Sequence, residues 1–231
     1  MRWRMGWMMF LVVAAMGVHA VPPLHHYRFD GGAITDSAGG CHGKVKRLAQ
    51  TEGLYGKALY FPQTDKKEHN VVCGVSIPIP PETFAKPFTV TLWVKLDDNK
   101  DFRQFRELLF LGGGRGPGIR LTYFYNSLAA RSGDGKKVVS VGTNSSRVVV
   151  PTGRWCQVAV AYDGAHCRIY LDAVLKAEGA IVFTQGKGAL SVGSYNAGYT
   201  YPLQGALDEL KIYGKALDAA EIAAAFLAEM K

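Results

Sequence analysis

The sequence predicts an all-β sandwich that ends in one short helix. Between residues 27 and 213, short stretches of alternating apolar and polar residues are separated by turns that contain glycine. This spacing is typical of a sandwich, because βαβ units would place helical stretches between the strands. Only the tail has helical spacing, since Asp218 and Glu221 stand three residues apart as in a capping box. We expect this helix at residues 219–229, with an apolar stripe of Ile222, Phe226 and Leu227.

The clearest strand covers residues 88–95. Its even-numbered residues are apolar and share one face, which is expected to lie in the core. The opposite face carries Trp93, a side chain that is rarely left fully in solvent. The strand is therefore expected to be central in its sheet, with something covering part of its outer face.

A hairpin is predicted at residues 155–173, with its loop at residues 163–166. In this register Tyr162 faces Cys167, and the pairs Val160–Ile169, Val158–Leu171 and Cys156–Ala173 follow on the same face. Cys156 and Cys167 then lie about 20 Å apart at ~3.3 Å per residue, whereas a disulfide needs Cα atoms within about 7 Å. The two cysteines should not bond to each other. Other strands are expected at residues 58–61, 70–77, 107–111, 119–125, 146–150, 189–192 and 206–213.

Length and composition fit one globular domain behind an export signal. The chain has 231 residues, of which 48% are hydrophobic, and this excludes a disordered or collagen-like protein. Residues 1–20 combine two arginines, an apolar stretch and a Val18-His19-Ala20 cleavage pattern, so we expect a signal peptide. The alternative is a membrane anchor, but the stretch is shorter than the ~20 residues that span a bilayer. The mature domain would cover residues 21–231, with 25 basic and 19 acidic residues and a net charge of +6.

Export makes disulfide formation possible, because oxidising compartments favour paired cysteines. The chain has four cysteines, at positions 41, 73, 156 and 167. A single bridge between Cys41 and Cys73 is our preference, with Cys156 and Cys167 as small buried side chains. Other pairings stay open at this point.

Seven sequence blocks stand in an order that resembles a known domain. They are YRFD (27–30), DS (36–37), GLYGKALYF (53–61), PFTVTLWV (87–94), RWCQVAVAYDG (154–164), IYLD (169–172) and GALDELKIY (205–213). Together they resemble the laminin-G-like branch of the concanavalin A-like lectin/glucanase superfamily, over nearly the whole mature chain. The resemblance implies a jelly roll of two antiparallel sheets, one of them concave.

The resemblance also implies a structural calcium ion between the first and last strands. Asp208 matches the block that supplies a carboxylate in several families, and Asp30 and the carbonyl of Gly56 are suitable oxygen ligands. This chain departs from the pattern in having no second acidic residue beside Asp30. The alternative is that Asp208 and Glu209 only shape the end of a strand.

Tyrosines near residues 195–201 are the best candidates for ligand binding. Tyr195 and Tyr199 can stack on the apolar face of a sugar ring, and Asn196 can bind its hydroxyl groups. Tyr125 is added because alternation would place it on one face with Tyr123. The alternative for each tyrosine is packing at the base of a loop.

Arg115 lies in a glycine-rich segment at residues 112–118. A phosphate-binding loop would continue into Lys and Ser or Thr and then a helix, whereas here an alternating strand follows. The segment is therefore predicted to be a hairpin loop, which could bring Arg115 to the rim of a binding face.

Catalysis and nucleic-acid binding are not expected. Retaining glycosidases need two carboxylates about 5–5.5 Å apart, but Glu107 stands alone on its strand. The charge of +6 has no stripe that would follow a phosphate backbone. An acidic polysaccharide fits it better, with contributions from Arg103, Arg106, Arg115 and Arg131.

The expected protein is an exported, non-catalytic lectin-like module that binds a polysaccharide or glycoconjugate. It would be periplasmic, cell-surface or extracellular, with no membrane span after cleavage of the signal. Two alternatives remain at this point. One is a protein-interaction or structural domain at the cell surface, for which the sandwich is a scaffold. The other is a diverged polysaccharide-active enzyme.

Overall fold

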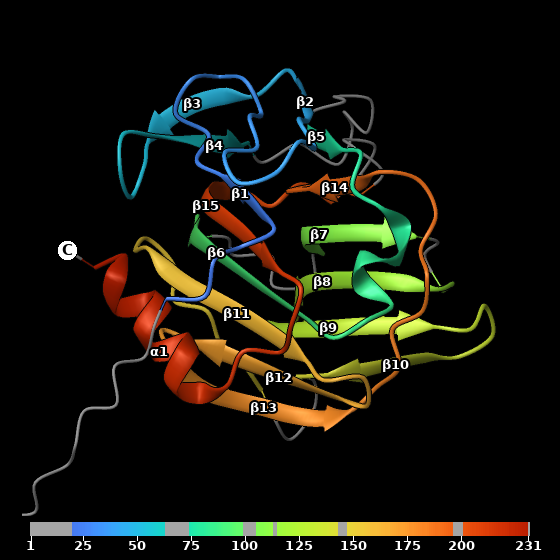
Figure 1. The fold of residues 1–231 in the computed structure, drawn as a ribbon. Helices are drawn as coiled ribbons and strands as arrows, with labels where there is room; N and C mark the ends of the chain where they lie inside the picture. The colour runs from blue at the N-terminus through green and yellow to red at the C-terminus, as the bar shows by residue number, and fades with distance from the viewer. Residues whose placement is uncertain are drawn as a thin grey trace, which may run out of the picture.

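Two antiparallel sheets form the fold, with one short α-helix at the C-terminal end (Figure 1). The structure is a computed structural model that describes residues 20–62, 74–98, 105–112, 115–142, 147–195 and 201–230. The predicted all-β sandwich is confirmed, and its two sheets are consistent with a jelly roll.

The eight-stranded sheet has the order β13 (Val174–Ala180), β12 (His166–Leu171), β11 (Cys156–Tyr162), β6 (Phe88–Leu96), β15 (Gly205–Tyr213), β4 (Lys57–Phe61) and β3 (Ala49–Glu52), with β1 (His25–Tyr27) also paired to β15. The seven-stranded sheet has the order β10 (Val138–Val141), β9 (Ser127–Gly133), β8 (Gly118–Phe124), β7 (Arg106–Gly112), β14 (Leu190–Val192), β5 (Gly74–Ile77) and β2 (Lys44–Lys46). A 3₁₀ helix, η1 (Pro81–Phe84), precedes β6, and α1 (Ala219–Ala228) follows β15.

The core lies between the two sheets and follows the alternation of the strands. Phe88, Val90, Leu92 and Val94 of β6 are fully buried in it, as their spacing predicts. Strand β6 is central, because it pairs with β11 on one side and β15 on the other. The hairpin is confirmed for three of its four predicted pairs, since Tyr162 pairs with Cys167, Val160 with Ile169 and Val158 with Leu171. The fourth pair, Cys156–Ala173, is wrong, because β12 ends at Leu171 and the backbone turns at positive φ at residues 172 and 173.

Helix α1 covers part of the outer face of the eight-stranded sheet. The rings of Trp93 and Phe226 stack with their centroids 5.6 Å apart. Glu229, just after the helix, accepts hydrogen bonds from Trp93 Nε1 at 2.5 Å and from Gln157 Nε2 at 2.8 Å, and it pairs with Lys211. The outer face that carries Trp93 is thus covered, as expected.

The helix itself begins as the sequence predicts. Asp218 accepts a hydrogen bond from the backbone of Glu221, whose side chain bonds back to the backbone of Asp218. Ile222 is fully buried against the sheet. Leu227 is 62% exposed, so placing it in the packed stripe is wrong.

Several strands differ from the prediction. Residues 147–150 form no regular strand, although their backbone bonds to the start of β9 through Leu128 and Val148. Strands β1, β2, β3, β9, β10 and β13 are not anticipated. The first three are only three or four residues long, β9 and β13 contain many small residues, and β13 is largely exposed at a sheet edge.

The cysteines follow the hairpin geometry. Cys156 and Cys167 are buried and free, and burial raises the pKa of their thiols to about 11 and about 12. Cys41 is also a free thiol. Its expected partner, Cys73, lies outside the described residues.

Candidate functional site

Strand β8 directs alternate side chains to the two faces of the seven-stranded sheet. Ile119, Leu121 and Tyr123 belong to the core between the sheets. Arg120 and Phe124 belong to the opposite, outer face, where both are partly exposed. Tyr123 is only 4% exposed, so the expectation that it shares a face with Tyr125 is wrong.

The physical reason is a change of backbone conformation at the end of β8. Tyr125 has a positive φ of 50° in the turn that leads to β9, and this ends the strand alternation. Its ring is 49% exposed and lies 4.1 Å from the ring of Phe124, measured between centroids. Tyr125 therefore joins the outer face.

A row of paired residues crosses the outer face of the seven-stranded sheet. Directly opposed residues in antiparallel strands share a face, so the pairing register defines this row. The outer row consists, from β2 to β10, of Lys44, Ser76, Ser191, Phe110, Arg120, Arg131 and Ser140. Two arginines, Arg120 and Arg131, thus stand directly opposite each other on the third and second strands from the β10 edge.

A buried carboxylate beside the outer row binds the first of these arginines. Arg120 Nε donates to Glu107 Oε1 at 2.7 Å, and its Nη2 forms a second bond to the same oxygen. Thr122 Oγ1 lies 3.4 Å from Glu107 Oε2. Burial raises the pKa of Glu107, while the Arg120 charge and hydrogen bonds oppose that rise. The positive charge of Arg120 balances the negative charge of Glu107, and the two hydrogen bonds hold the Arg120 side chain in place.

Six aromatic side chains form a continuous chain of ring contacts on this face, and three of them lie around the Arg120 guanidinium. The aromatic chain runs in the order Tyr125, Phe124, Phe105, Tyr201, Tyr195 and Phe110. Ring centroids of successive members lie between 3.7 Å (Phe124–Phe105) and 6.2 Å (Tyr201–Tyr195) apart. Arg120 Cζ lies 5.3 Å, 5.4 Å and 5.9 Å from the ring centroids of Phe105, Tyr195 and Tyr201. Cation–π attraction therefore holds these rings around one charge.

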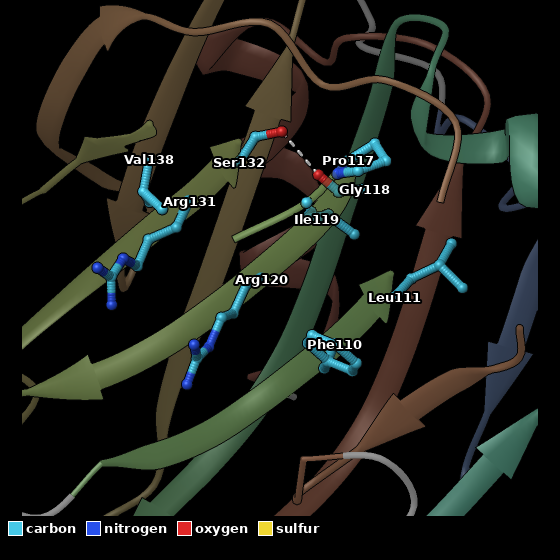
Figure 2. Close-up of a pocket in the computed structure, with 10 residues that line it drawn as sticks. Phe110, Leu111, Pro117, Gly118, Ile119, Arg120, Arg131, Ser132 and Val138 are labelled. Atoms are coloured by element: carbon cyan, nitrogen blue, oxygen red, sulfur yellow. Dashed lines mark hydrogen bonds between the residues drawn. The ribbon is translucent and has the colours of Figure 1, made fainter. Parts of the chain in front are cut away.

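A small pocket adjoins the outer row at the beginning of β8. Figure 2 shows Arg120 and Arg131 extending side by side from neighbouring strands, with Phe110 beside them. The rest of the lining is mostly apolar or backbone and comes from Leu111, residues 116–119, Ser132 and Val138. Ser132 Oγ donates to the carbonyl of Gly118 at 2.9 Å, which closes the pocket between β8 and β9.

The structure brings together only some of the residues that the sequence suggests for ligand binding. Tyr125 and Tyr195 are both members of the aromatic chain. Arg115 is exposed in the loop between β7 and β8, where its carbonyl accepts a hydrogen bond from Gly135 N at 2.8 Å. Asn196 and Tyr199 lie outside the described residues.

The arginines that the net charge suggests for binding an acidic polysaccharide lie in different environments. Arg131 lies in the outer row, whereas Arg103 lies outside the described residues. Arg106 is only 4% exposed, and its Nη1 donates to the carbonyl of Asp97 at 3.0 Å. It is a buried structural residue, so assigning it to a ligand surface is wrong.

Sequence reasoning missed Arg120, Phe105 and Phe124. The sequence does carry a signal for two of them: Arg120 and Phe124 alternate with the apolar core residues of β8, which indicates that they lie on the outer face. The convergence with Phe105 depends on strand pairing and loop placement, which the sequence does not display.

Comparison with known proteins agrees with this architecture. A laminin G family model, described as the concanavalin A-like lectin/glucanases superfamily, matches residues 74–223. The chain belongs to this superfamily. A search of curated proteins finds no match. Among the described residues, no helix is long and apolar enough to cross a membrane.

Solved structures with the same superfamily fold include carbohydrate-associated domains. Domain 4 of an extracellular GH43 arabinanase from Geobacillus stearothermophilus, solved with arabinotriose, has a TM-score of 0.65 and 21% identity. That match covers 89% of this chain and 98% of the arabinanase domain. The binding domain of botulinum neurotoxin DC in complex with SialylT has a TM-score of 0.67 and 10% identity. The match covers 90% of this chain and 52% of the neurotoxin domain, so this chain spans about half of that domain's length.

The residues suggested for calcium meet at the turn between β3 and β4. Asp208 is fully buried, and its Oδ2 accepts a hydrogen bond from Leu54 N at 2.8 Å. Asp30 Oδ1 accepts one from Lys57 N at 2.9 Å, on the other end of the same turn. A side chain at Gly56, whose φ is +54°, would collide with Asp30. Glycine thus allows Asp30 to approach the turn closely.

The oxygen donors at this turn are of the kind that calcium prefers, and several of them already accept backbone hydrogen bonds. Asp208 Oδ1 accepts one from Glu209 N at 2.8 Å, and the Gly56 carbonyl accepts one from Gly53 N at 3.1 Å. Burial raises the pKa of Asp208 to about 7, although hydrogen bonds from Leu54 and Glu209 oppose the rise. A cation beside Asp208 would favour its ionised form.

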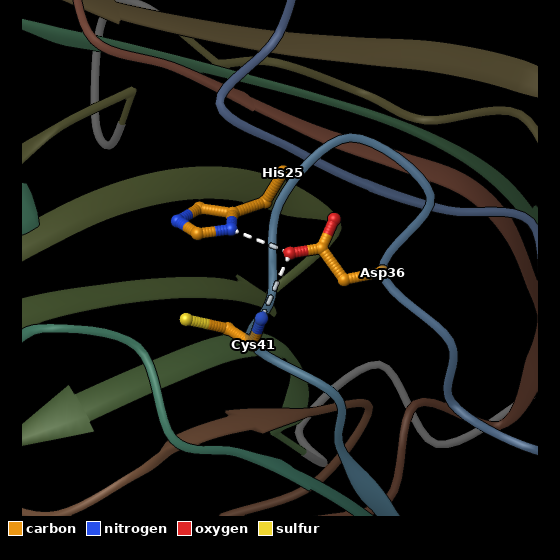
Figure 3. A group of neighbouring side chains, drawn as sticks. All are labelled: His25, Asp36 and Cys41. Carbon is orange, nitrogen blue, oxygen red and sulfur yellow. Dashed lines mark hydrogen bonds and ion pairs between the residues drawn. The ribbon is translucent and has the colours of Figure 1, made fainter.

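A second polar cluster, at the edge of β1, consists of His25, Asp36 and Cys41 (Figure 3). Their potential ligand atoms lie within 4.8 Å of one another. His25 Nδ1 and the Cys41 backbone N contact Asp36 Oδ2 at 2.7 Å and 3.1 Å. The other oxygen, Oδ1, accepts hydrogen bonds from the backbone of residues 26, 38 and 39. Both carboxylate oxygens of Asp36 therefore accept hydrogen bonds that organise this loop.

Replacing Asp36 by Asn is expected to destabilise the domain by about 2–4 kcal/mol at pH 7, because buried donors lose a charged acceptor. Burial acts to raise the pKa of Asp36, but the hydrogen bonds outweigh it and hold that pKa well below its ordinary value. The stability that Asp36 contributes is therefore present above its unfolded pKa of about 4 and is lost as the pH falls further. Urea unfolding at pH 7, 4 and 2 measures both effects.

The control for this substitution is Asp134→Asn in the exposed turn between β9 and β10, which should cost less than about 1 kcal/mol. Equal losses for the two variants at pH 7, or an unchanged acid sensitivity in Asp36→Asn, would contradict the assignment.

Proposed function

We propose that the protein is an exported, non-catalytic module that binds carbohydrate on the outer face of its seven-stranded sheet. The observation that carries this proposal is the aromatic chain around Arg120, with Tyr125 and Tyr201 49% and 42% exposed. Sugar rings present apolar C–H faces and hydroxyl groups together, so stacking rings beside fixed polar groups are a suitable surface. Export rests on the signal-peptide pattern of residues 1–20.

Polar side chains next to the rings would fix the orientation of a bound sugar. The Arg120 guanidinium is held by Glu107, and Arg131 and Ser140 continue the outer row. Arginine donors and a hydroxyl group can bind sugar hydroxyls or ring substituents. Because the Glu107–Arg120 ion pair is already formed, a bound sugar would meet a preorganised surface.

The state of Glu107 supports a binding role over catalysis. Its side chain is fully buried and bound by two donors of Arg120. A carboxylate in this state is not available as a nucleophile, and glycoside hydrolysis needs a second carboxyl group about 5–10 Å away. The outer row contains no further acidic residue.

Relatives with this fold support carbohydrate as the ligand class. One solved domain carries arabinotriose and another carries SialylT. A related neurotoxin binding domain is solved with rat synaptotagmin II, and a protein ligand is therefore the second candidate. The surface described above favours sugar, because its exposed groups are rings and hydrogen-bond donors.

Replacing Tyr201 by Ala is expected to weaken glycan binding about tenfold, which corresponds to about 1.4 kcal/mol, because one stacking ring is removed. Binding would be measured on an array of neutral and acidic glycans, followed by calorimetry with the strongest ligand. Tyr55→Ala is a matched control, because Tyr55 is similarly exposed (40%) but lies in the turn between β3 and β4 of the other sheet.

Two results would contradict the proposal. Unchanged affinity in folded Tyr201→Ala would remove the aromatic chain from the binding surface. Failure of the wild-type protein to bind any glycan, combined with capture of one specific protein after glycosidase treatment, would replace carbohydrate with a protein ligand.

We also propose that calcium stabilises the turn between β3 and β4. Calcium is expected to raise the melting temperature and a chelator to lower it, because an ion that binds only the folded state stabilises that state. Asp30→Asn should reduce the calcium effect without removing the buried Asp208, and Asp208→Ala should abolish it. Scanning calorimetry with calcium, magnesium or chelator measures this shift. Equal melting temperatures in all three conditions would contradict the calcium site.

A further inference from the structure

We propose that the sugar carries a carboxylate and that Arg131 binds this group. The inference rests on the proposed function, since it names the chemical class of ligand for the same surface. Three observations on the outer row support it: the count of charges, the environment of Arg131, and the direction of its guanidinium.

The charges around the outer row do not balance. Arg120 and Arg131 face each other on β8 and β9, whereas Glu107 is the one carboxylate bonded to this pair in the described part of the chain. Glu107 is engaged by two donors of Arg120. The partner of Arg131 is neutral, because its Nε donates to Ser140 Oγ at 3.2 Å. Among the described residues, one positive charge therefore lies on this face without a carboxylate bonded to it.

The surroundings of Arg131 make an anion favourable there. Burial and the neighbouring Arg120 charge both lower the pKa of Arg131, and Glu107 only partly opposes them. A guanidinium stays charged in proteins, so the energetic cost of this placement persists in the absence of a counter-charge. A bound carboxylate would offset the lost hydration and separate the two like charges with an opposite one.

The geometry places this charge where a sugar substituent would lie. Arg131 Cζ is 6.0 Å from the ring centroid of Phe105, and Arg120 Cζ is 5.3 Å from the same centroid. Figure 2 shows the two guanidiniums extending in one direction from the sheet. A sugar ring on the aromatic chain would therefore hold its substituent next to Arg131. The planar fork of a guanidinium matches the two oxygens of a carboxylate.

The test compares glycans that differ only in charge. Oligosaccharides of galacturonate, mannuronate and hyaluronan would be titrated into the wild-type protein, each beside its methyl-esterified form. Sialyllactose with lactose, neutral arabinan and carboxylate-free κ-carrageenan complete the set. We expect at least one carboxylate glycan to bind ten times more tightly than its ester, with an affinity that falls as salt rises.

Variants of Arg131 identify the group responsible. Arg131→Gln should remove the preference for the free acid while leaving the weak affinity for the ester unchanged. Arg131→Lys keeps the charge but not the fork, so it should retain only part of the preference. Lys136→Gln removes one exposed positive charge from the nearby turn and should leave the preference intact. Melting temperatures establish that each variant is folded.

The outcomes separate this inference from the proposed function. Equal affinity for acid and ester, binding of carrageenan alone, or an unchanged preference in Arg131→Gln would overturn the role of Arg131 while carbohydrate binding stands. If Arg131→Gln does not fold, Arg131→Lys is used instead. The role of Arg131 is then overturned if Arg131→Lys prefers the free acid over the ester as strongly as the wild type does and the wild-type affinity does not change with salt. If no glycan binds, the proposed function and this inference both fail.

Discussion

Each sheet of a two-layer sandwich can bury only one of its faces in the shared core, and the rest of this structure follows from that constraint. Alternation places half of the side chains of every strand on an outer face, which needs its own cover or its own use. On the eight-stranded sheet, helix α1 covers Trp93, and Glu229 satisfies Trp93 and Gln157. On the seven-stranded sheet, the outer face instead carries charged and aromatic side chains that remain partly exposed.

The ion pair between Arg120 and Glu107 makes that second face possible. A buried carboxylate without a partner would be costly, but two donors from one guanidinium compensate it. The same guanidinium lies within 6 Å of three aromatic rings. Phe105 immediately precedes β7, whereas Tyr195 and Tyr201 lie between β14 and β15, far from it in sequence. The Arg120 guanidinium thus contacts both the buried Glu107 carboxylate and the rings of Phe105, Tyr195 and Tyr201. Burying a charged pair costs desolvation energy that apolar side chains would not cost. The presence of this pair beside exposed rings therefore supports the proposal of ligand binding.

Strong alternation made much of the fold predictable from the sequence. Strand β6 and the hairpin of β11 and β12 have long apolar faces, so their register follows from residue identity. Strands β9 and β13 consist largely of small or exposed residues, and their existence depends on neighbours that pair with them. The site was harder to predict for a similar reason. Arg120 opposes Arg131 only because of the register between β8 and β9, and Tyr125 reaches the outer face only because the backbone turns at positive φ.

The central claim is that the outer face of the seven-stranded sheet is the ligand surface, and amide NMR during a glycan titration tests it most directly. The tightest-binding glycan should shift the amides of β7, β8 and β9 near Phe110, Arg120 and Arg131, together with those of Tyr195 and Tyr201. The amides of β6, β11 and α1 should remain unchanged. Shifts concentrated on α1 and the eight-stranded sheet, with none on the outer row, would contradict this account.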